Sequence, residues 1–201
     1  TTRGPLNMCI TVFGSVPAHH ALRRDGARVD DDIWISGSLG DARLGLEIVT
    51  RHLALSETDT AIALQRLHRP TPRGSLGLAL RGIANAAIDI SDGLIGDLGH
   101  ILQRSMLGAT LEADLLPIGR ALQSQDPQTQ LEFALNGGDD YELCFCAPPA
   151  KRDRVIMAAK QAGVVVTRLG QIVPTPGLRV LDSAGHPVKL HSSSFDHFSK
   201  P

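Results

Sequence analysis

Two short acidic stretches contain the residues whose types and spacing best suit chemistry. The first is Asp89-Ile-Ser-Asp-Gly-Leu94, where an apolar run over 86–90 ends in two carboxylates and a hydroxyl just before a helical pattern. The second is Gly137-Gly-Asp-Asp-Tyr-Glu142, which opens onto an apolar, strand-like run over 143–147. Such oxygens are hard ligands that suit Mg²⁺, commonly together with substrate phosphates. Two such turns on one sheet could share a Mg²⁺-phosphate site.

The first stretch also has an ordinary structural interpretation, in which Ser91 or Asp92 caps the helix that follows. Both residue types are favoured there because their side chains accept hydrogen bonds from free backbone N–H groups. This interpretation does not account for Asp89, which lies inside an otherwise apolar run. A carboxylate in such a setting needs a compensating partner, and a cation is a natural one. We therefore predict metal binding here.

The second stretch could be a solvated polar turn, as isolated acidic turns usually are. Its density of acid weighs against that interpretation, because Asp139, Asp140 and Glu142 place three carboxylates within four residues. Such groups repel one another unless something positive holds them, such as Mg²⁺, an ammonium group or a cationic ligand. We predict a functional role for this turn.

Other candidates carry weaker signals. Arg23 and Arg24 could donate paired hydrogen bonds to a phosphate, although adjacent arginines usually lie on a solvated face. The glycine-rich stretch over 37–41 could cradle phosphate at a helix start, yet it lacks the Gly-Lys-Ser/Thr of a P-loop. Cys144 and Cys146 would share one face of a strand, and we expect small core residues rather than a redox pair.

The composition fits a globular protein that acts on small molecules. The 201 residues are 42% hydrophobic and carry a formal net charge of −1, so the balance shows no basic excess suited to nucleic acid or to an anionic membrane. No apolar run reaches the roughly 18 residues of a membrane span, and residues 1–20 lack a secretion signal. We expect a cytoplasmic location and small-molecule partners.

Strand-like and helix-like patterns alternate around the acidic stretches. Apolar and β-branched runs predict strands, and apolar residues at helical spacing predict helices. Strands are expected over about 7–13, 33–35, 86–90, 109–113, 141–147, 164–169 and 178–181, the last in a hairpin with 187–190. Helices are expected over about 42–53, 58–69, 76–85, 94–105, 128–135 and 150–162. Both acidic stretches thus lie at junctions between strands and helices.

Several motifs together resemble the thiamine-monophosphate kinase family. They are the two acidic stretches and Phe195-Asp-His-Phe198 near the end of the chain. The segments Thr1-Thr-Arg-Gly-Pro-Leu6, Arg23-Arg-Asp-Gly-Ala27 and Ser36-Gly-Ser-Leu-Gly-Asp41 are also similar to that family. The order and spacing match too, so the resemblance covers nearly the whole chain. Each motif alone is unspecific, whereas the combination is specific.

The resemblance implies a fold and a division of the chain. The family belongs to the superfamily of aminoimidazole ribonucleotide synthetase, whose members have an N-terminal β-rich domain and a C-terminal α+β domain. Residues 17–201 would form the α+β domain, with a mixed sheet covered by helices. Residues 1–16, with the strand expected over 7–13, would be a remnant of the N-terminal domain that binds ATP and Mg²⁺.

The resemblance also implies an activity, the ATP-dependent phosphorylation of thiamine monophosphate to thiamine diphosphate by direct in-line transfer with Mg²⁺. Mg²⁺ held by carboxylates would offset the repulsion between converging phosphates. Matching positions carry over metal binding to Asp89 and Asp92, ATP binding to Arg24 and Ser91, and substrate binding to Asp139 and Phe195, with Phe195 stacking on the thiamine moiety. Glutamate is also common in the family at position 139, so the carboxylate here has a shorter reach.

The chain departs from the family pattern at its start. The family has a Gly-Gly-Asp segment with a metal-ligand aspartate just before the match to Thr1-Thr2, and an N-terminal domain with further Mg²⁺ and ATP ligands and the usual dimer interface. Neither is among these 201 residues. We therefore expect the chain to be the later part of a longer, homodimeric kinase and to be inactive, or nearly so, alone.

Two alternatives stay open. One is another ATP-using member of the superfamily, of the aminoimidazole ribonucleotide or selenophosphate synthetase type, although the pair of acidic motifs favours the kinase. The other is a non-catalytic module that keeps the acidic turns for binding metal or nucleotide without phosphoryl transfer. Metal-ligand aspartates upstream of Thr1 would favour the enzyme, and their absence would favour the module.

Overall fold

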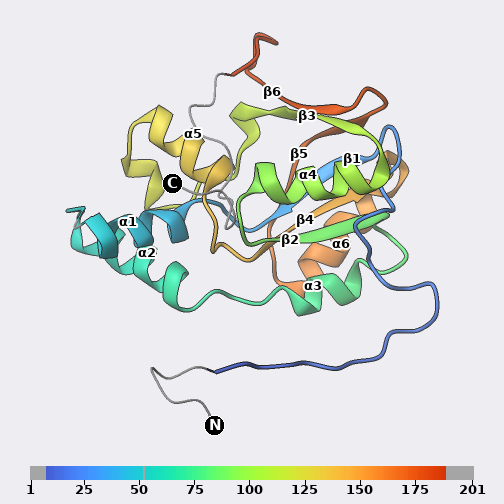
Figure 1. The fold of residues 1–201 in the computed structure, drawn as a ribbon, viewed down its shortest axis with the longest axis horizontal. Coiled ribbons are helices and arrows are strands. Elements are labelled where there is room, and N and C mark those ends of the chain that lie inside the picture. The colour runs from blue at the N-terminus through green and yellow to red at the C-terminus, as the bar shows by residue number, and fades with distance from the viewer. Residues whose placement is uncertain (1–7, 52, 189–201) are drawn as a thin grey trace.

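One mixed sheet of six strands organises the protein, as a computed structural model describes it over residues 8–51 and 53–188. The strand order is β2-β4-β1-β5-β3-β6, and every neighbouring pair is antiparallel except β3 and β6, which run parallel. Helices lie on both sides of the sheet (Figure 1). The α+β class and the helix-covered mixed sheet that the sequence predicts are therefore confirmed.

The elements follow the predicted alternation closely. The strands are β1 (Asp32–Ser36), β2 (Ala86–Ile90), β3 (Gly108–Glu112), β4 (Glu142–Ala147), β5 (Val166–Val173) and β6 (Gly177–Leu181). The helices are α1 (Asp41–Arg51), α2 (Glu57–His68), α3 (Gly74–Ala79), α4 (Leu94–Ser105), α5 (Pro127–Asn136) and α6 (Arg152–Ala162), with short 3-10 turns at Ala113–Leu115, Leu122–Ser124 and Pro149–Lys151. None of the helices within the described part of the chain is both long and apolar enough to cross a membrane.

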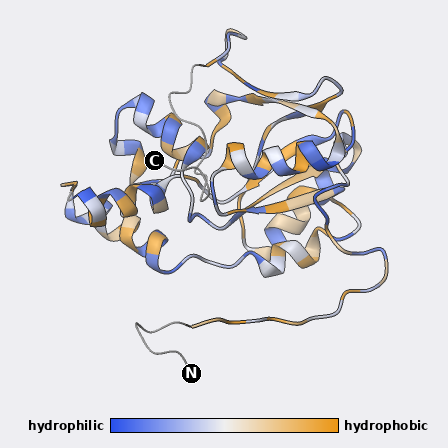
Figure 2. Ribbon diagram, in the orientation of Figure 1, coloured by the Kyte–Doolittle hydropathy of each residue, from blue (hydrophilic) through white to orange (hydrophobic). Residues whose placement is uncertain are grey.

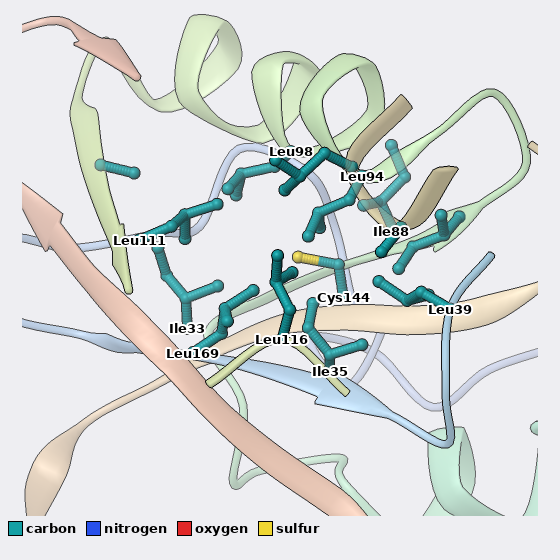
Figure 3. Close-up of a cluster of buried hydrophobic side chains, with 14 of the residues drawn as sticks. Ile33, Ile35, Leu39, Ile88, Leu94, Leu98, Leu111, Leu116, Cys144 and Leu169 are labelled. Carbon is teal, nitrogen blue, oxygen red and sulfur yellow. The ribbon is translucent and has the colours of Figure 1, made fainter. Parts of the chain in front are cut away.

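The larger core lies between α4 and the sheet. Leu94 and Leu98 recur at helical spacing on α4 and are fully buried against strand residues that include Ile88 and Cys144 (Figure 3). Burial of such a stripe is what holds an amphipathic helix in place. The helix that follows the first acidic stretch is therefore anchored rigidly to the sheet.

The opposite face of the sheet packs against α3 and α6. Trp34 and Phe145 stack there with ring centroids 6.3 Å apart, and both are buried. Both helices carry hydrophobic residues (Figure 2). Leu76 of α3 and Val155 of α6 are buried in this second core, whereas Leu78 and Ile156 of the same helices are exposed. Cys144 and Cys146 lie on the α4 side and are fully buried, which confirms their role as core residues.

The strand expected over 7–13 is not formed by its described residues. Residues 8–16 have no regular secondary structure, and Ile10, Val12 and Phe13 are largely exposed. The segment runs apart from the sheet (Figure 1). A strand needs a neighbour to pair its backbone groups, and no strand of the described chain lies beside this one. The expectation of a regular strand here was therefore wrong.

Candidate functional site

The two acidic turns meet because β2 and β4 are antiparallel neighbours. Ile90, the last residue of β2, pairs with Glu142, the first residue of β4. Beyond this pair, the N–H of Asp139 donates to the carbonyl of Ser91 and the N–H of Tyr141 donates to the carbonyl of Ile90, both at 2.9 Å. The turns are therefore joined backbone to backbone, although they lie far apart in the sequence.

Two glycines permit this close approach. A Cβ at Gly138 would lie 2.4 Å from the carbonyl oxygen of Ser91, so a larger residue would push the turns apart. Gly93 has a φ of 109°, and a Cβ there would lie 2.8 Å from the backbone of Asn136. Glycine adopts such a conformation at little cost, whereas other residues do not. The glycine of each acidic motif thus has a packing role.

A buried carboxylate that sequence reasoning missed holds the first turn. Gly93 occupies the N-cap of α4, so the expected cap by Ser91 or Asp92 was wrong. Instead Oδ2 of Asp97 accepts hydrogen bonds from the N–H groups of Ser91 (2.9 Å) and Asp92 (3.0 Å). Burial raises the pKa of Asp97 despite these bonds, and the charges of Asp92 and Asp89 add to the rise. In the sequence, the position of Asp97 one turn into α4 was the signal that could have indicated this role.

Asp89 occupies an exposed position on β2. Its neighbours Ile88 and Ile90 point to the opposite, buried face, because successive residues of a strand alternate. The argument that a cation must compensate a carboxylate inside an apolar strand was therefore wrong. Asp89 instead lines two open cavities, of about 580 and 470 Å³. Its carboxylate is accessible to a ligand without any burial penalty.

Protein groups hold Glu142 in the second turn. Its buried carboxylate accepts hydrogen bonds from Nε of Arg73 (2.6 Å), from Arg66 (3.0 Å) and from the hydroxyl of Ser36 (2.6 Å). The Ser36 oxygen in turn accepts the N–H of Leu143 at 2.8 Å. Glu142 thereby ties β4 to β1, to α2 and to the start of α3. Its charge is balanced inside the protein, without a ligand.

Asp140 occupies the phosphate cradle suggested over 37–41. Its carboxylate accepts the N–H groups of Gly40 (2.7 Å) and Ala42 (3.4 Å) at the start of α1. Burial raises the pKa of Asp140 to about 7, although these donors and the charge of Arg66 oppose the rise. The start of α1 already binds the carboxyl group of Asp140. The glycine-rich sequence that suggested a phosphate cradle is therefore explained by this internal contact.

Asp139, the first carboxylate of the second turn, lines a cavity. Its backbone is left-handed, with a φ of 68°, as the tight turn requires. The cavity measures about 210 Å³ and is also lined by Ser91, Asp92 and Arg43. Arg43 pairs with Glu47 and lies 5.5 Å from the ring centroid of Phe133, and sequence reasoning did not single it out. The structure thus brings Ser91, Asp92 and Asp139 together.

Tyr141 lies where the carboxylates of both turns converge. Its hydroxyl donates to Oδ1 of Asp139 at 3.5 Å, and its side chain lines the 470 Å³ cavity beside Asp89. Burial raises the pKa of Tyr141, and the charges of Asp139, Asp89 and Asp92 raise it further. Asp89 and Asp92 line different cavities, yet both are close enough to act on this one phenol. Negative charge is therefore concentrated between the turns.

Arg24 lies near Asp89, at a cavity that does not include the second acidic turn. Both residues line the 580 Å³ cavity, which Arg23 and Arg104 also border. The Nε of Arg23 donates to Asp25 at 2.9 Å, so its charge is partly balanced. The structure thus brings Arg24 and Asp89 together at one opening. Phe195 lies outside the described residues.

The sequence and the fold place this chain among known proteins. The family model described as AIR synthase related protein, C-terminal domain, matches residues 28–183. The chain belongs to this family. Asp89, Ser91, Asp92 and Asp139 all fall inside the matched AIR synthase related C-terminal domain, whereas Arg24 precedes it.

Thiamine-monophosphate kinases are among the curated relatives of this chain. That of Salmonella typhimurium is 45% identical over the whole chain, and that of Escherichia coli K12 is 42% identical. The chain spans 62% of the length of each. The resemblance recognised in the sequence motifs is thereby confirmed.

Solved structures agree with this relation. The thiamine-monophosphate kinase of Stenotrophomonas maltophilia K279a superposes with a TM-score of 0.78 at 43% identity, over 86% of this chain and 56% of that one. AaThiL complexed with AMPPCP and TMP gives a TM-score of 0.70 at 32% identity, over 88% and 54%. HypE of Escherichia coli, at 20% identity and a TM-score of 0.67, shares the fold.

Proposed function

We propose that this chain takes part in the ATP-dependent phosphorylation of thiamine monophosphate to thiamine diphosphate. The observation that carries the proposal is the backbone pairing of the two acidic turns, which gathers Ser91, Asp92 and Asp139 around one cavity beside Asp89. The thiamine-monophosphate kinase relatives, similar over the full chain, support the choice of reaction. A relative solved with AMPPCP and TMP supports the choice of ligands.

We assign Mg²⁺ binding to Asp89 and Asp92, which line different cavities but both act on the phenol of Tyr141. Within 8–51 and 53–188 no three His, Cys, Asp or Glu side chains form a complete metal-binding group. Mg²⁺ is commonly held by one or two carboxylates together with phosphate oxygens and water. Burial raises the pKa of Tyr141, and the charges of Asp139, Asp89 and Asp92, which a cation would offset, raise it further. When bound, Mg²⁺ would neutralise phosphate charge during transfer.

We assign the nucleotide to the side of Arg24 and thiamine monophosphate to the side of Asp139. The 580 Å³ cavity combines the guanidinium of Arg24, suited to phosphate, with the apolar side chain of Leu22. Asp139 lines the 210 Å³ cavity, where its carboxylate would contact the substrate. Ser91, a proposed ATP contact, borders the cavity of Asp139 and not the 580 Å³ cavity. Phosphoryl transfer of this kind needs mainly positioning and charge stabilisation.

The remaining expectations stay predictions. We propose that residues 1–16 belong with an N-terminal unit, which the exposed Ile10, Val12 and Phe13 support. We further propose that Phe195 stacks on thiamine, that the full-length protein is a cytoplasmic homodimer and that the 201-residue chain alone is inactive or nearly so. Formation of thiamine diphosphate by the purified chain would contradict the last of these.

Calorimetric titration tests the proposal directly. Thiamine monophosphate and a non-hydrolysable ATP analogue are titrated with Mg²⁺ into the wild-type chain, Asp92→Asn and Asp153→Asn. Asp153 is an exposed carboxylate in the first turn of α6 and serves as the matched control. We expect Mg²⁺-dependent binding that Asp92→Asn weakens and Asp153→Asn leaves unchanged. If the wild-type chain and its full-length form bind neither ligand, the substrate assignment is wrong.

A further inference from the structure

We propose that Asp97 is a positioning residue that fixes Ser91 and Asp92 for nucleotide and metal, an inference that rests on the proposed function. Asp97 itself lines none of the three cavities around the acidic turns. Its effect on a ligand would therefore be transmitted through the backbone of the first turn.

The hydrogen-bond geometry carries this inference. One oxygen of Asp97 accepts two consecutive backbone N–H groups, from Ser91 at 2.9 Å and from Asp92 at 3.0 Å. Such a shared acceptor holds two adjacent peptide planes in one orientation. Gly93, the N-cap residue of α4, has no side chain that could take over this task. The direction in which Ser91 and Asp92 leave the turn therefore depends on Asp97.

Asp97 can impose this orientation because its own helix is rigid. Leu94 and Leu98 (Figure 3) and Ile101 of α4 are fully buried in the larger core, and Asp97 of the same helix is also buried. The second turn adds a further constraint, since the N–H of Asp139 binds the carbonyl of Ser91. The first turn is thus held by two contacts, one with Asp97 of α4 and one with Asp139 of the second turn.

Burial of Asp97 argues for a specific task. Taking a carboxyl group out of water is costly unless its hydrogen bonds compensate, and an apolar residue would serve the core of α4 without that cost. Groups that orient direct ligands commonly change metal affinity by about 10- to 100-fold when they are removed. We expect a loss of that size in Mg²⁺-dependent binding of a non-hydrolysable ATP analogue when Asp97 loses its acceptor oxygen.

The test compares Asp97→Ala with Asp97→Asn by calorimetry on the full chain. Asparagine keeps one carbonyl oxygen that can accept both N–H groups, so it should retain most of the affinity. Asp126→Ala is the matched control, because Asp126 accepts the N–H groups of Gln128 and Thr129, both at 3.1 Å, at the start of α5. If Asp97→Ala does not fold, Asp97→Leu fills the space without an acceptor and replaces it. Thermal unfolding confirms that each variant is folded.

The outcomes separate this inference from the proposed function. At least a tenfold loss in Asp97→Ala, with rescue by asparagine and no loss in Asp126→Ala, supports positioning. Unchanged binding in Asp97→Ala overturns it, as does an equal loss in Asp126→Ala, which would indicate general destabilisation. Wild-type protein that binds no nucleotide would remove the proposed function, and the positioning role with it.

Discussion

The turn after β2 and the turn before β4 are both acidic and lie side by side, yet their carboxylates have different surroundings. In the second turn, Glu142 is bound by two arginines and Asp140 by the start of α1. In the first turn, Asp89 is exposed and lines two cavities. Several carboxylates close together in a sequence can thus indicate internal ion pairs as well as a ligand site. Only the groups that each carboxylate contacts in the folded chain distinguish the two cases.

Removing Glu142 should produce the largest loss of stability. Its side chain is 1% exposed, and Glu142→Ala would leave Arg66 and Arg73, themselves 16% and 15% exposed, without their carboxylate. Breaking a buried ion pair from one side costs about 3–5 kcal/mol, which urea unfolding would measure. Glu112→Ala, at a half-exposed carboxylate 3.7 Å from Arg168, is the control and should change stability by less than about 0.5 kcal/mol. A similar small change in Glu142→Ala would refute the structural role.

Asp89→Asn should show the opposite pattern. The side chain is exposed and makes no hydrogen bond or ion pair within the described residues, so the free energy of unfolding should change by less than about 0.5 kcal/mol. Mg²⁺-dependent binding of an ATP analogue, followed by calorimetry, should weaken by about tenfold or more. A variant that loses stability but keeps binding would reverse the assignment of the two turns.

Asp140 should leave a signature in the dependence of stability on pH. Burial raises its pKa from 3.8 to about 7 in the folded chain, so between these values the folded state binds more protons than the unfolded state. Because proton binding is linked to folding, the contribution of Asp140 to the free energy of unfolding should fall as pH rises from about 4 to about 7. Asp140→Asn removes that contribution. Urea unfolding across this range should show a flatter profile in the variant, and an unchanged profile would contradict it.

The smallest expected effect is a shift in the ionisation of Tyr141, the single tyrosine of the chain. After burial, the charge of Asp139 raises the pKa of Tyr141 more than those of Asp89 and Asp92 do. Asp139→Asn should therefore lower this pKa, and Asp89→Asn should lower it less. Alkaline titration followed by ultraviolet absorbance reports the phenol directly. Equal pKa values in all three proteins would show that the turns do not share an electrostatic field.

Much of the fold could be predicted because secondary structure depends on near neighbours. The helix expected over 94–105 coincides with α4, and the strand expected over 86–90 coincides with β2. The strand expected over 7–13 failed, because its apolar pattern requires a pairing partner that the described chain does not supply. The N-cap expected for α4 was wrong as well, since Gly93 occupies that position and Asp97 accepts the N–H groups of Ser91 and Asp92.

The sequence by itself determined the helices and strands, the acidic motifs and their glycines, because side-chain periodicity and backbone freedom are local properties. Only the tertiary structure decided which carboxylates are available to a ligand. Glu142 meets Arg73 and Arg66 across 69 and 76 residues, and Asp140 meets Gly40 across 100. The partner of a charged group depends on which distant segments pack together, and no local pattern encodes that.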